Sequence, residues 1–221
     1  MEITWYGLGC FRIAERGYPA VITDPFDEDK TGYTLPRVRA EIVSLSTPLE
    51  DATKVRWRGF RGVQRTLASP GEYEIGGLFV TGVSSYRDTK KGTLRGENII
   101  YTFEVNGFSV CHLGELGHVL NQSRIEAIGN VNVLLIPVGL EEGLTPSMAS
   151  EVVSLIEPNI VIPTNYQTPG LKIKRKSANR FLKEMGITSA PTEAVLKLTS
   201  GNIPEATTVI VLEPQIKKEK L

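Results

Sequence analysis

The sequence has few of the residues that would indicate an extracellular, membrane-spanning or strongly charged protein. Its 221 residues include 2 cysteines, Cys10 and Cys111, which do not suggest a disulfide framework. The 25 basic residues equal the 25 acidic ones, so a net charge of zero gives no electrostatic reason to expect nucleic acid or an anionic membrane as a partner. The uncharged apolar runs are only as long as a strand, which excludes a bilayer-spanning helix.

The first residues lack the features of a secretory leader. Met-Glu-Ile-Thr-Trp has no basic segment and no long apolar segment behind it. Both cysteines lie inside apolar runs, as buried structural thiols do. We therefore expect a cytoplasmic protein.

Short apolar segments separated by glycine and proline predict many strands and a few late helices. Expected strands cover 3–6, 11–14, 20–23, 42–45, 62–67, 73–75, 78–83, 99–105, 108–112, 133–136, 160–162, 195–198 and 208–212. Expected helices cover 121–128, 147–156 and 177–185. Asn106-Gly107 predicts a type I′ hairpin, because both central positions of that turn need positive φ. Since no segment is long enough to be a linker, we expect one domain over 1–214 and a frayed lysine-rich tail over 215–221.

Seven segments, spread in order over most of the chain, resemble the motifs of one enzyme family. They read WYGLGCF (5–11), TDPF (23–26), PGEYEIGG (70–77), RGEN (95–98), HLGELGH (112–118), LLIPVG (134–139) and VIPTNY (161–166). The chain thus resembles the metallo-β-lactamase-fold superfamily, and within it small Zn-dependent hydrolases close to the UlaG-like lactonases. The resemblance implies an α/β fold, a four-layer αββα sandwich, with a site in loops along one sheet edge.

Residues 42–53, IVSLSTPLEDAT, occupy the frame in which this family places its metal-binding His-x-His-x-Asp-His loop. The resemblance assigns eight positions to the metal cleft: Leu8, Thr47, Leu49, Asp51, Ala52, Arg87, Glu115 and Asn165. All of them except Asp51 and Glu115 stand where the family has histidine. Glu115 stands where the family has the bridging aspartate and is one methylene longer.

These replacements remove the donors of a zinc-type site. Zinc needs three or four N, O or S donors at about 2.0–2.3 Å, and Leu49 and Ala52 offer only methyl groups. Asp51, Glu115 and Asn165 supply only oxygens, which leaves a hard cation such as Mg²⁺ or Ca²⁺ as the alternative. We expect no metal and no cofactor, so the metal-bound hydroxide that serves the family as nucleophile has no source.

The carboxylates that remain need compensation, because two anions in a half-buried cleft repel each other. Arg87 is the one basic residue that the resemblance places among the former ligands. Its guanidinium, which keeps its proton in proteins, is expected to pair with Asp51 and Glu115 as a permanent substitute cation. In the alternative, Arg87 points into solvent from a surface loop.

Other candidate chemistry is weaker. His112 and His118, the only histidines, flank Glu115 without the i, i+4 spacing of a zincin helix, and structural hydrogen bonds are expected for both. Ser46 lies near the cleft, but no base is obviously within its reach. The basic run 172–176 is typical of a solvated loop in a neutral chain, the alternative being a phosphate or RNA site.

Two hypotheses of function follow. The favoured one is a non-catalytic pseudoenzyme that binds or scaffolds an unknown small molecule or protein, because the scaffold motifs remain around a cleft without its histidines. The alternative is a metal-dependent hydrolase-like enzyme with residual or relocated hydrolytic activity. Because members of the family often form oligomers, the resemblance also leaves a homo-oligomer open, although no segment identifies an interface.

Overall fold

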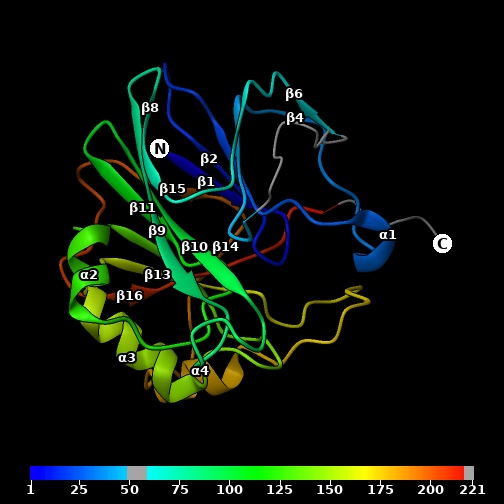
Figure 1. Ribbon diagram of the computed structural model, residues 1–221, viewed down its shortest axis with the longest axis vertical. Coiled ribbons are helices and arrows are strands. Elements are labelled where there is room, and N and C mark those ends of the chain that lie inside the picture. The colour runs from blue at the N-terminus through cyan, green and yellow to red at the C-terminus, as the bar shows by residue number, and fades with distance from the viewer. Residues whose placement is uncertain (49–58, 217–221) are drawn as a thin grey trace.

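Short apolar segments of the chain form β-strands, and most of these strands assemble into two sheets (Figure 1). The structure is a computed structural model that describes residues 1–48 and 59–216. In this part of the chain the first sheet has six strands in the order β15-β1-β2-β3-β5-β7. These strands are β1 (Glu2–Trp5), β2 (Phe11–Ala14), β3 (Val21–Thr23), β5 (Ile42–Ser44), β7 (Arg65–Leu67) and β15 (Leu196–Lys197).

The second sheet has seven described strands, in the order β16-β13-β12-β11-β10-β9-β8. They are β8 (Gly71–Ile75), β9 (Leu78–Tyr86), β10 (Glu97–Val105), β11 (Phe108–His112), β12 (Val133–Pro137), β13 (Ile160–Thr164) and β16 (Thr208–Val209). Two-residue strands form two further pairs, β4 (Val38–Arg39) with β6 (Phe60–Arg61) and β14 (Thr192–Glu193) with β17 (Val211–Leu212).

The two sheets pack face to face and enclose the main hydrophobic core. Trp5 and Phe11 come from the first sheet, Tyr101 and Phe103 come from the second, and all four belong to one buried cluster. Each large aromatic side chain buries on the order of 150–250 Å², so these contacts contribute a large share of the folding free energy. Cys111 lies in the same cluster as a buried free thiol, as its apolar sequence context predicts.

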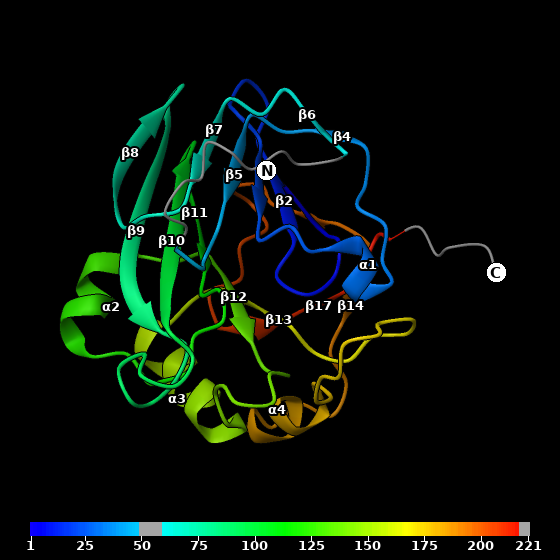
Figure 2. The same cartoon turned by 45° about the vertical axis from the view of Figure 1, so that its right-hand side comes forward.

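Helices flank the two sheets. α2 (Gln122–Ile128), α3 (Pro146–Ile156) and α4 (Asn179–Glu184) lie on one side, and the single turn α1 (Glu28–Thr31) lies on the opposite side (Figures 1 and 2). α3 begins where the Thr145 side chain accepts a hydrogen bond from the backbone N–H of Met148 and Pro146 fixes the first turn. It buries one stripe of side chains, Ala149, Val152, Val153 and Ile156. The expected αββα sandwich is confirmed. In the described part of the chain, the helix on the side of the six-stranded sheet is the single turn α1.

The direction of the strands decides where polar loop residues gather. In the first sheet β3 is parallel to β5, and β1 and β3 are both antiparallel to β2, so β1, β3 and β5 run the same way. In the second sheet β9 and β11 are both antiparallel to β10, and β11, β12 and β13 are parallel. Figure 2 shows β9 and β12 ending toward the same side. Ligands bind at the carboxyl ends of strands in sheets of this kind.

The predicted elements differ from the observed ones mainly where strands are very short. Strands 11–14 and 108–112 have the predicted bounds, and Asn106 and Gly107 both have positive φ, as the type I′ hairpin requires. The expected strand 208–212 is instead two strands, β16 and β17, which pair in different sheets. An apolar run indicates extended backbone but does not say with which partner it pairs.

The packed part of the chain extends into the segment that we expected to be a frayed tail. The backbone N–H of Gln215 donates to the carbonyl of Trp5 at 2.7 Å, and Ile216 packs against a small buried cluster around Leu8. The rest of the expected tail lies outside the described residues. Among residues 1–48 and 59–216, no helix is long and apolar enough to cross a membrane.

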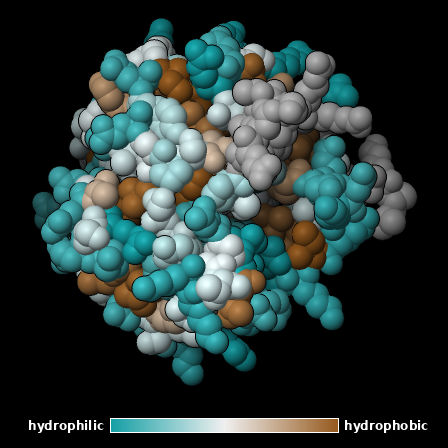
Figure 3. Space-filling model, in the orientation of Figure 1, coloured by the Kyte–Doolittle hydropathy of each residue, from teal (hydrophilic) through white to brown (hydrophobic). Residues whose placement is uncertain are grey.

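The surface is mostly hydrophilic on the face shown in Figure 3, where apolar residues form separate patches. Large exposed hydrophobic side chains in the described residues are Phe79, Leu94 and Leu155. Isolated apolar side chains of this kind are normal on a protein surface.

Phe103 and Phe79 offer a matched test of the core between the sheets. They lie on neighbouring strands, with Phe103 fully buried and Phe79 54% exposed. Phe103→Ala is expected to lower the free energy of unfolding by about 3–5 kcal/mol, because it removes buried apolar surface and leaves a cavity. Phe79→Ala is expected to change it by less than about 1 kcal/mol. Chemical denaturation measures both, and equal effects would contradict the assignment of the core.

Candidate functional site

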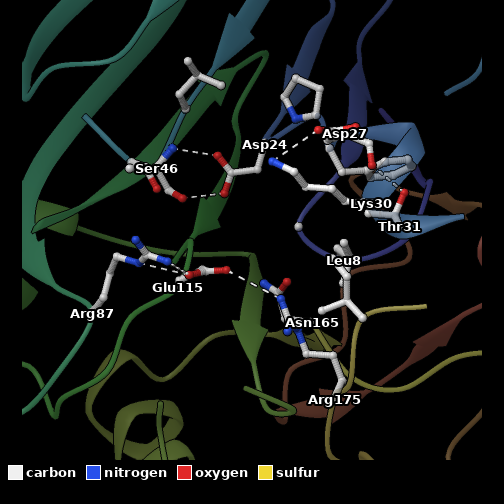
Figure 4. Close-up of a pocket in the computed structure, with 16 residues that line it drawn as sticks. Leu8, Asp24, Asp27, Lys30, Thr31, Ser46, Arg87, Glu115, Asn165 and Arg175 are labelled. Atoms are coloured by element: carbon white, nitrogen blue, oxygen red, sulfur yellow. Dashed lines mark hydrogen bonds and ion pairs between the residues drawn. The ribbon is translucent and has the colours of Figure 1, made fainter. Parts of the chain in front are cut away.

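A cavity of about 590 Å³ opens where the loops of the two sheets meet. Five of the eight positions that the resemblance assigns to the cleft line it: Leu8, Thr47, Arg87, Glu115 and Asn165. The other three, Leu49, Asp51 and Ala52, lie outside the described residues. Figure 4 shows Arg87 and Glu115 on one side of this cavity, and Asp24 with Ser46 above them.

The shared direction of six strands brings these residues together. Each follows the carboxyl end of its strand: Leu8 after β1, Asp24 after β3, Thr47 after β5, Arg87 after β9, Glu115 after β11 and Asn165 after β13. Because parallel and alternate antiparallel strands end at the same edge of a sheet, side chains far apart in sequence meet there.

The loop that carries Glu115 is held by close backbone contacts. Gly114 has a φ of +62°, and a Cβ added there would lie 2.3 Å from the Cβ of Ser46. A Cβ at Gly117 would lie 2.1 Å from the carbonyl oxygen of Arg87. The backbone N–H of Glu115 donates to Oδ1 of the buried Asn98 at 2.9 Å. These contacts fix the direction in which the Glu115 side chain leaves the loop.

Glu115 is bound by arginine. Arg87 donates from Nε to Oε2 of Glu115 at 3.0 Å, and its Nη2 contacts the same oxygen. Nη2 of Arg95 lies 3.3 Å from this oxygen. The expected contact between Arg87 and Glu115 is therefore present, and the alternative in which Arg87 points into solvent is excluded. The pairing expected with Asp51 lies outside the described residues.

Asp88 organises the loop that carries both arginines. Its carboxylate accepts four backbone hydrogen bonds, from Lys90, Gly92, Leu94 and Arg95, at 2.7–3.1 Å. Burial by itself raises the pKa of Asp88, but these four bonds outweigh it and lower the pKa. The ionised Asp88 therefore closes the turn and directs Arg95 toward the cavity wall.

Arg175 approaches Glu115 from the opposite side, which the sequence did not predict. Its Nη2 lies 3.9 Å from Oε1 of Glu115, and its side chain is only 16% exposed. The interpretation of 172–176 as a solvated loop is therefore wrong for Arg175. The run returns to the protein because Gln167 binds it, accepting from the backbone N–H of Arg175 at 3.0 Å. Nothing in the spacing of the basic residues distinguishes the one that turns inward.

Asp24, Ser46 and His112 form a second polar group beside the cavity. Asp24 accepts from the backbone N–H of Ser46 at 2.6 Å and from its hydroxyl, and burial raises the pKa of the Asp24 carboxyl. Nε2 of His112 lies 3.9 Å from Oδ2 of Asp24, too far for a hydrogen bond. Among the described residues neither ring nitrogen of the fully buried His112 has a partner. The expected structural hydrogen bond of His112 is absent there.

His118 does have the structural role that the sequence predicts. Its Nδ1 lies 2.8 Å from the carbonyl oxygen of Val119, and its Nε2 accepts from the backbone N–H of Tyr86 at 3.2 Å. Burial lowers the pKa of His118, so the neutral ring that can make both bonds is favoured. His118 therefore fixes the end of β9, immediately before Arg87.

Strained backbone is concentrated at the cavity. Among the described residues six non-glycine residues have positive φ, and three of them line this space: Leu8 at +52°, Asp24 at +33° and Asn165 at +55°. Aspartate and asparagine tolerate this conformation, but for leucine it costs roughly 1–2 kcal/mol. The Leu8 carbonyl accepts from Trp5 Nε1 at 2.9 Å and from the backbone N–H of Asn165 at 3.3 Å, which holds the strained turn. Such strain is typical of functional sites.

Within residues 1–48 and 59–216, the donor groups at the cavity do not form a zinc-type centre. The chain has two histidines, of which His118 is engaged with backbone groups and His112 is buried behind Asp24. The described carboxylates that line the cavity are already engaged, Asp24 by Ser46, Asp27 by Lys30 and Glu115 by arginine. Among residues 1–48 and 59–216, no three histidine, cysteine, aspartate or glutamate side chains converge as metal ligands. Arginine beside Glu115 also repels a second cation.

Comparison with known proteins identifies the class. Residues 2–165 match the family described as the beta-lactamase superfamily domain. This match covers well over half of the chain, which therefore belongs to the β-lactamase superfamily. A crystal structure from Thermotoga maritima, of a candidate Zn-dependent hydrolase of the metallo-β-lactamase superfamily, is 34% identical with a TM-score of 0.74. The match covers 96% of this chain and 97% of that one.

More distant relatives agree in fold and family. A UPF0173 metal-dependent hydrolase of Methanopyrus kandleri is 24% identical over 85% of this chain and 94% of its own length. A UPF0173 protein of Pyrococcus furiosus is 28% identical over 76% of this chain and 84% of its own. The structure of Igni18, a metallo hydrolase of Ignicoccus hospitalis, has a TM-score of 0.60 at 16% identity. The match covers 100% of this chain and 98% of the Igni18 chain, which shows that the two share a fold.

Arg87→Leu tests how strongly the Glu115 pair supports the fold. The two side chains are 25% and 20% exposed, so the variant is expected to lower the free energy of unfolding by about 1–2 kcal/mol at neutral pH, because it leaves a half-buried carboxylate without its closest partner. The effect stays below the 3–5 kcal/mol typical of a fully broken buried pair because Arg95 and Arg175 remain near Glu115.

Lys197→Leu is the control for that measurement. Lys197 and Glu2 form an exposed pair at 3.7 Å, and its loss is expected to change stability by less than about 1 kcal/mol. Urea denaturation of both variants, with a double-mutant cycle through Glu115→Gln, gives the coupling energy. An Arg87→Leu effect no larger than that of Lys197→Leu would mean that Arg87 does not compensate Glu115.

The burial of His112 is expected to make the protein less stable in mild acid. Burial lowers the pKa of His112 in the folded protein. As the pH falls below about 6.5, the unfolded chain therefore binds a proton that the folded chain does not, and stability decreases. His112→Phe should remove this contribution, which is at most about 1.4 kcal/mol per pH unit. Denaturation curves between about pH 7.5 and pH 5 measure it, and an equal pH slope in both proteins would refute the assignment.

Proposed function

We propose that this chain is a non-catalytic member of the β-lactamase superfamily that uses the cavity to bind a partner molecule. In this proposal the site no longer holds metal, and the arginines around Glu115 occupy the place and the electrostatic role of the metal ions. The chain then acts as a cytoplasmic pseudoenzyme whose partner is a small molecule or a protein.

The observation that carries the proposal is the environment of Glu115. This residue stands where the resemblance puts the carboxylate that bridges two metals, and guanidinium groups of Arg87 and Arg95 bind its Oε2. A guanidinium keeps its proton, so the carboxylate is compensated at every physiological pH. Without a metal-bound hydroxide the reaction of the family has no nucleophile.

The persistence of the cavity supports binding over a purely structural role. Leu8 and Asn165 keep a positive φ at its wall, and the strained backbone is typical of a site shaped for a ligand. Its volume of about 590 Å³ lies within the range of small-molecule sites, about 300–1,000 Å³.

The alternative is residual or relocated hydrolysis. It is supported by the names of similar proteins, among them metal-dependent hydrolases of Methanopyrus kandleri and Lysinibacillus sphaericus. Relocated chemistry would need a metal-free nucleophile, and Ser46, whose hydroxyl donates to Asp24, is the candidate in the cavity. Hydrolysis that is unaffected by chelator and lost in Ser46→Ala would favour this alternative.

Metal content and chelator response test the proposal. Protein expressed with added zinc, manganese and iron is expected to contain substoichiometric metal by mass spectrometry. Its thermal unfolding midpoint is expected to be the same with and without EDTA, because ligands that are absent contribute no binding energy to the folded state.

The related Thermotoga maritima protein, prepared in parallel, is the control for metal loading during expression. One equivalent of metal in the present chain, or a fall of several degrees in EDTA, would refute the proposal and restore the metal-dependent hydrolase. A panel of esters, lactones and phosphodiesters measured on the same samples then decides between residual and relocated activity.

A further inference from the structure

In the described part of the chain, three guanidinium groups converge on Glu115. Three guanidinium groups, from Arg87, Arg95 and Arg175, lie within 3.9 Å of this one carboxylate. Arg87 and Arg95 share its Oε2. Among residues 1–48 and 59–216, the charged group beside the other oxygen, Oε1, is Arg175, at a distance too long for a hydrogen bond. Arg175 is therefore the least engaged of the three guanidinium groups around Glu115.

Arg175 has the unused binding edge. The Nε–H and Nη2–H groups of an arginine lie along one edge and can hold two oxygens of a carboxylate or phosphate. Arg87 uses this same edge on Glu115. In Arg175, Nε is buried without a hydrogen-bond partner among the described residues, and the only hydrogen bond of the guanidinium is from Nη1 to the Lys174 carbonyl. An unsatisfied buried donor costs stability unless a ligand or solvent satisfies it.

The rest of the cavity suits the body of a small organic molecule. Apolar side chains of Leu8, Phe26 and Ile173 line it, together with the hydroxyls of Ser46 and Thr47. Figure 4 shows the Arg175 side chain next to Asn165 and facing Glu115, and Lys30 at the far side near Asp27. An acidic group bound at Arg175 would leave the remainder of the ligand against the apolar wall and the hydroxyls.

We infer that the cavity binds a small organic anion, a carboxylate or a phosphate monoester, whose acidic group is held by Arg175. This inference rests on the proposed function, since it assigns to the metal-free cavity the ligand class that the unpaired donor edge of Arg175 selects. The contact between Arg87 and Glu115 shows the same kind of binding within the protein, because the Glu115 carboxylate occupies the Nε–Nη2 edge of Arg87. The two acids share this chemistry, and the experiment separates them.

The test titrates chelator-treated protein with inorganic phosphate and, separately, with succinate, against chloride at matched ionic strength. Calorimetry should show saturable binding of at least one of these anions, and the thermal unfolding midpoint should rise with its concentration. Phosphate alone would identify a phosphate monoester, and succinate alone would identify a carboxylate.

Arg175→Gln should weaken the binding by about tenfold to a hundredfold, as expected for hydrogen bonds to a charged group. Arg175→Lys keeps the charge but loses the two-donor edge, so its affinity for the anion should lie between that of the unchanged protein and that of Arg175→Gln. Arg180→Gln is the matched control, because Arg180 is exposed on α4 and outside the cavity. Circular dichroism of each variant establishes that it folds.

Three results would overturn the inference. One is metal-free protein without a saturable response to either anion, which leaves the proposed function standing. Another is equal weakening in Arg175→Gln and Arg180→Gln. The last is anion binding that requires added zinc and is unchanged in Arg175→Gln, and this result, together with stoichiometric metal, would refute the proposed function as well.

Discussion

The site depends on one geometric constraint, the common direction of six strands in two sheets. β1, β3 and β5 end at the same edge as β9, β11 and β13, and each is followed by a loop that supplies one wall of the cavity. The hydrophobic core between Trp5 and Phe103 holds the two edges together. Any polar residue placed just after one of these strands is therefore delivered to the same half-buried space, whatever its chemistry.

The partial burial of charged groups then decides which side chains can stand at the cavity wall. In water a carboxylate needs no partner, but at the cavity wall its desolvation must be offset by an opposite charge or by hydrogen bonds. Glu115 is offset by arginine, and Asp24 by the amide and hydroxyl of Ser46, with a raised pKa that lessens its charge. Both solutions use groups of the chain itself, which is why they compete with a metal ion for the same oxygens.

The fold and five positions at the cavity could be predicted from the sequence, because both follow from local sequence patterns. Apolar runs gave the strands, and the seven segments placed Arg87 and Glu115 in one cleft, where the structure has them in contact. Arg95 and Asn98 lay in a segment recognised only as a scaffold motif. Arg175 was misjudged because its burial depends on Gln167 folding a loop back, a tertiary contact that no spacing in 172–176 encodes.

The two glycines of the Glu115 loop limit how this site can change through mutation. At Gly114 and Gly117 any side chain would overlap atoms of Ser46 or Arg87, so a substitution there displaces the whole loop before it can alter the cavity. Substitutions of the side chains that face the cavity can therefore exchange its chemical groups, as long as both glycines keep the loop backbone in place. Related proteins with such a loop are expected to differ in the side chains that face the cavity and to share the same backbone. A few codon changes would then be enough to add or remove a reactive group.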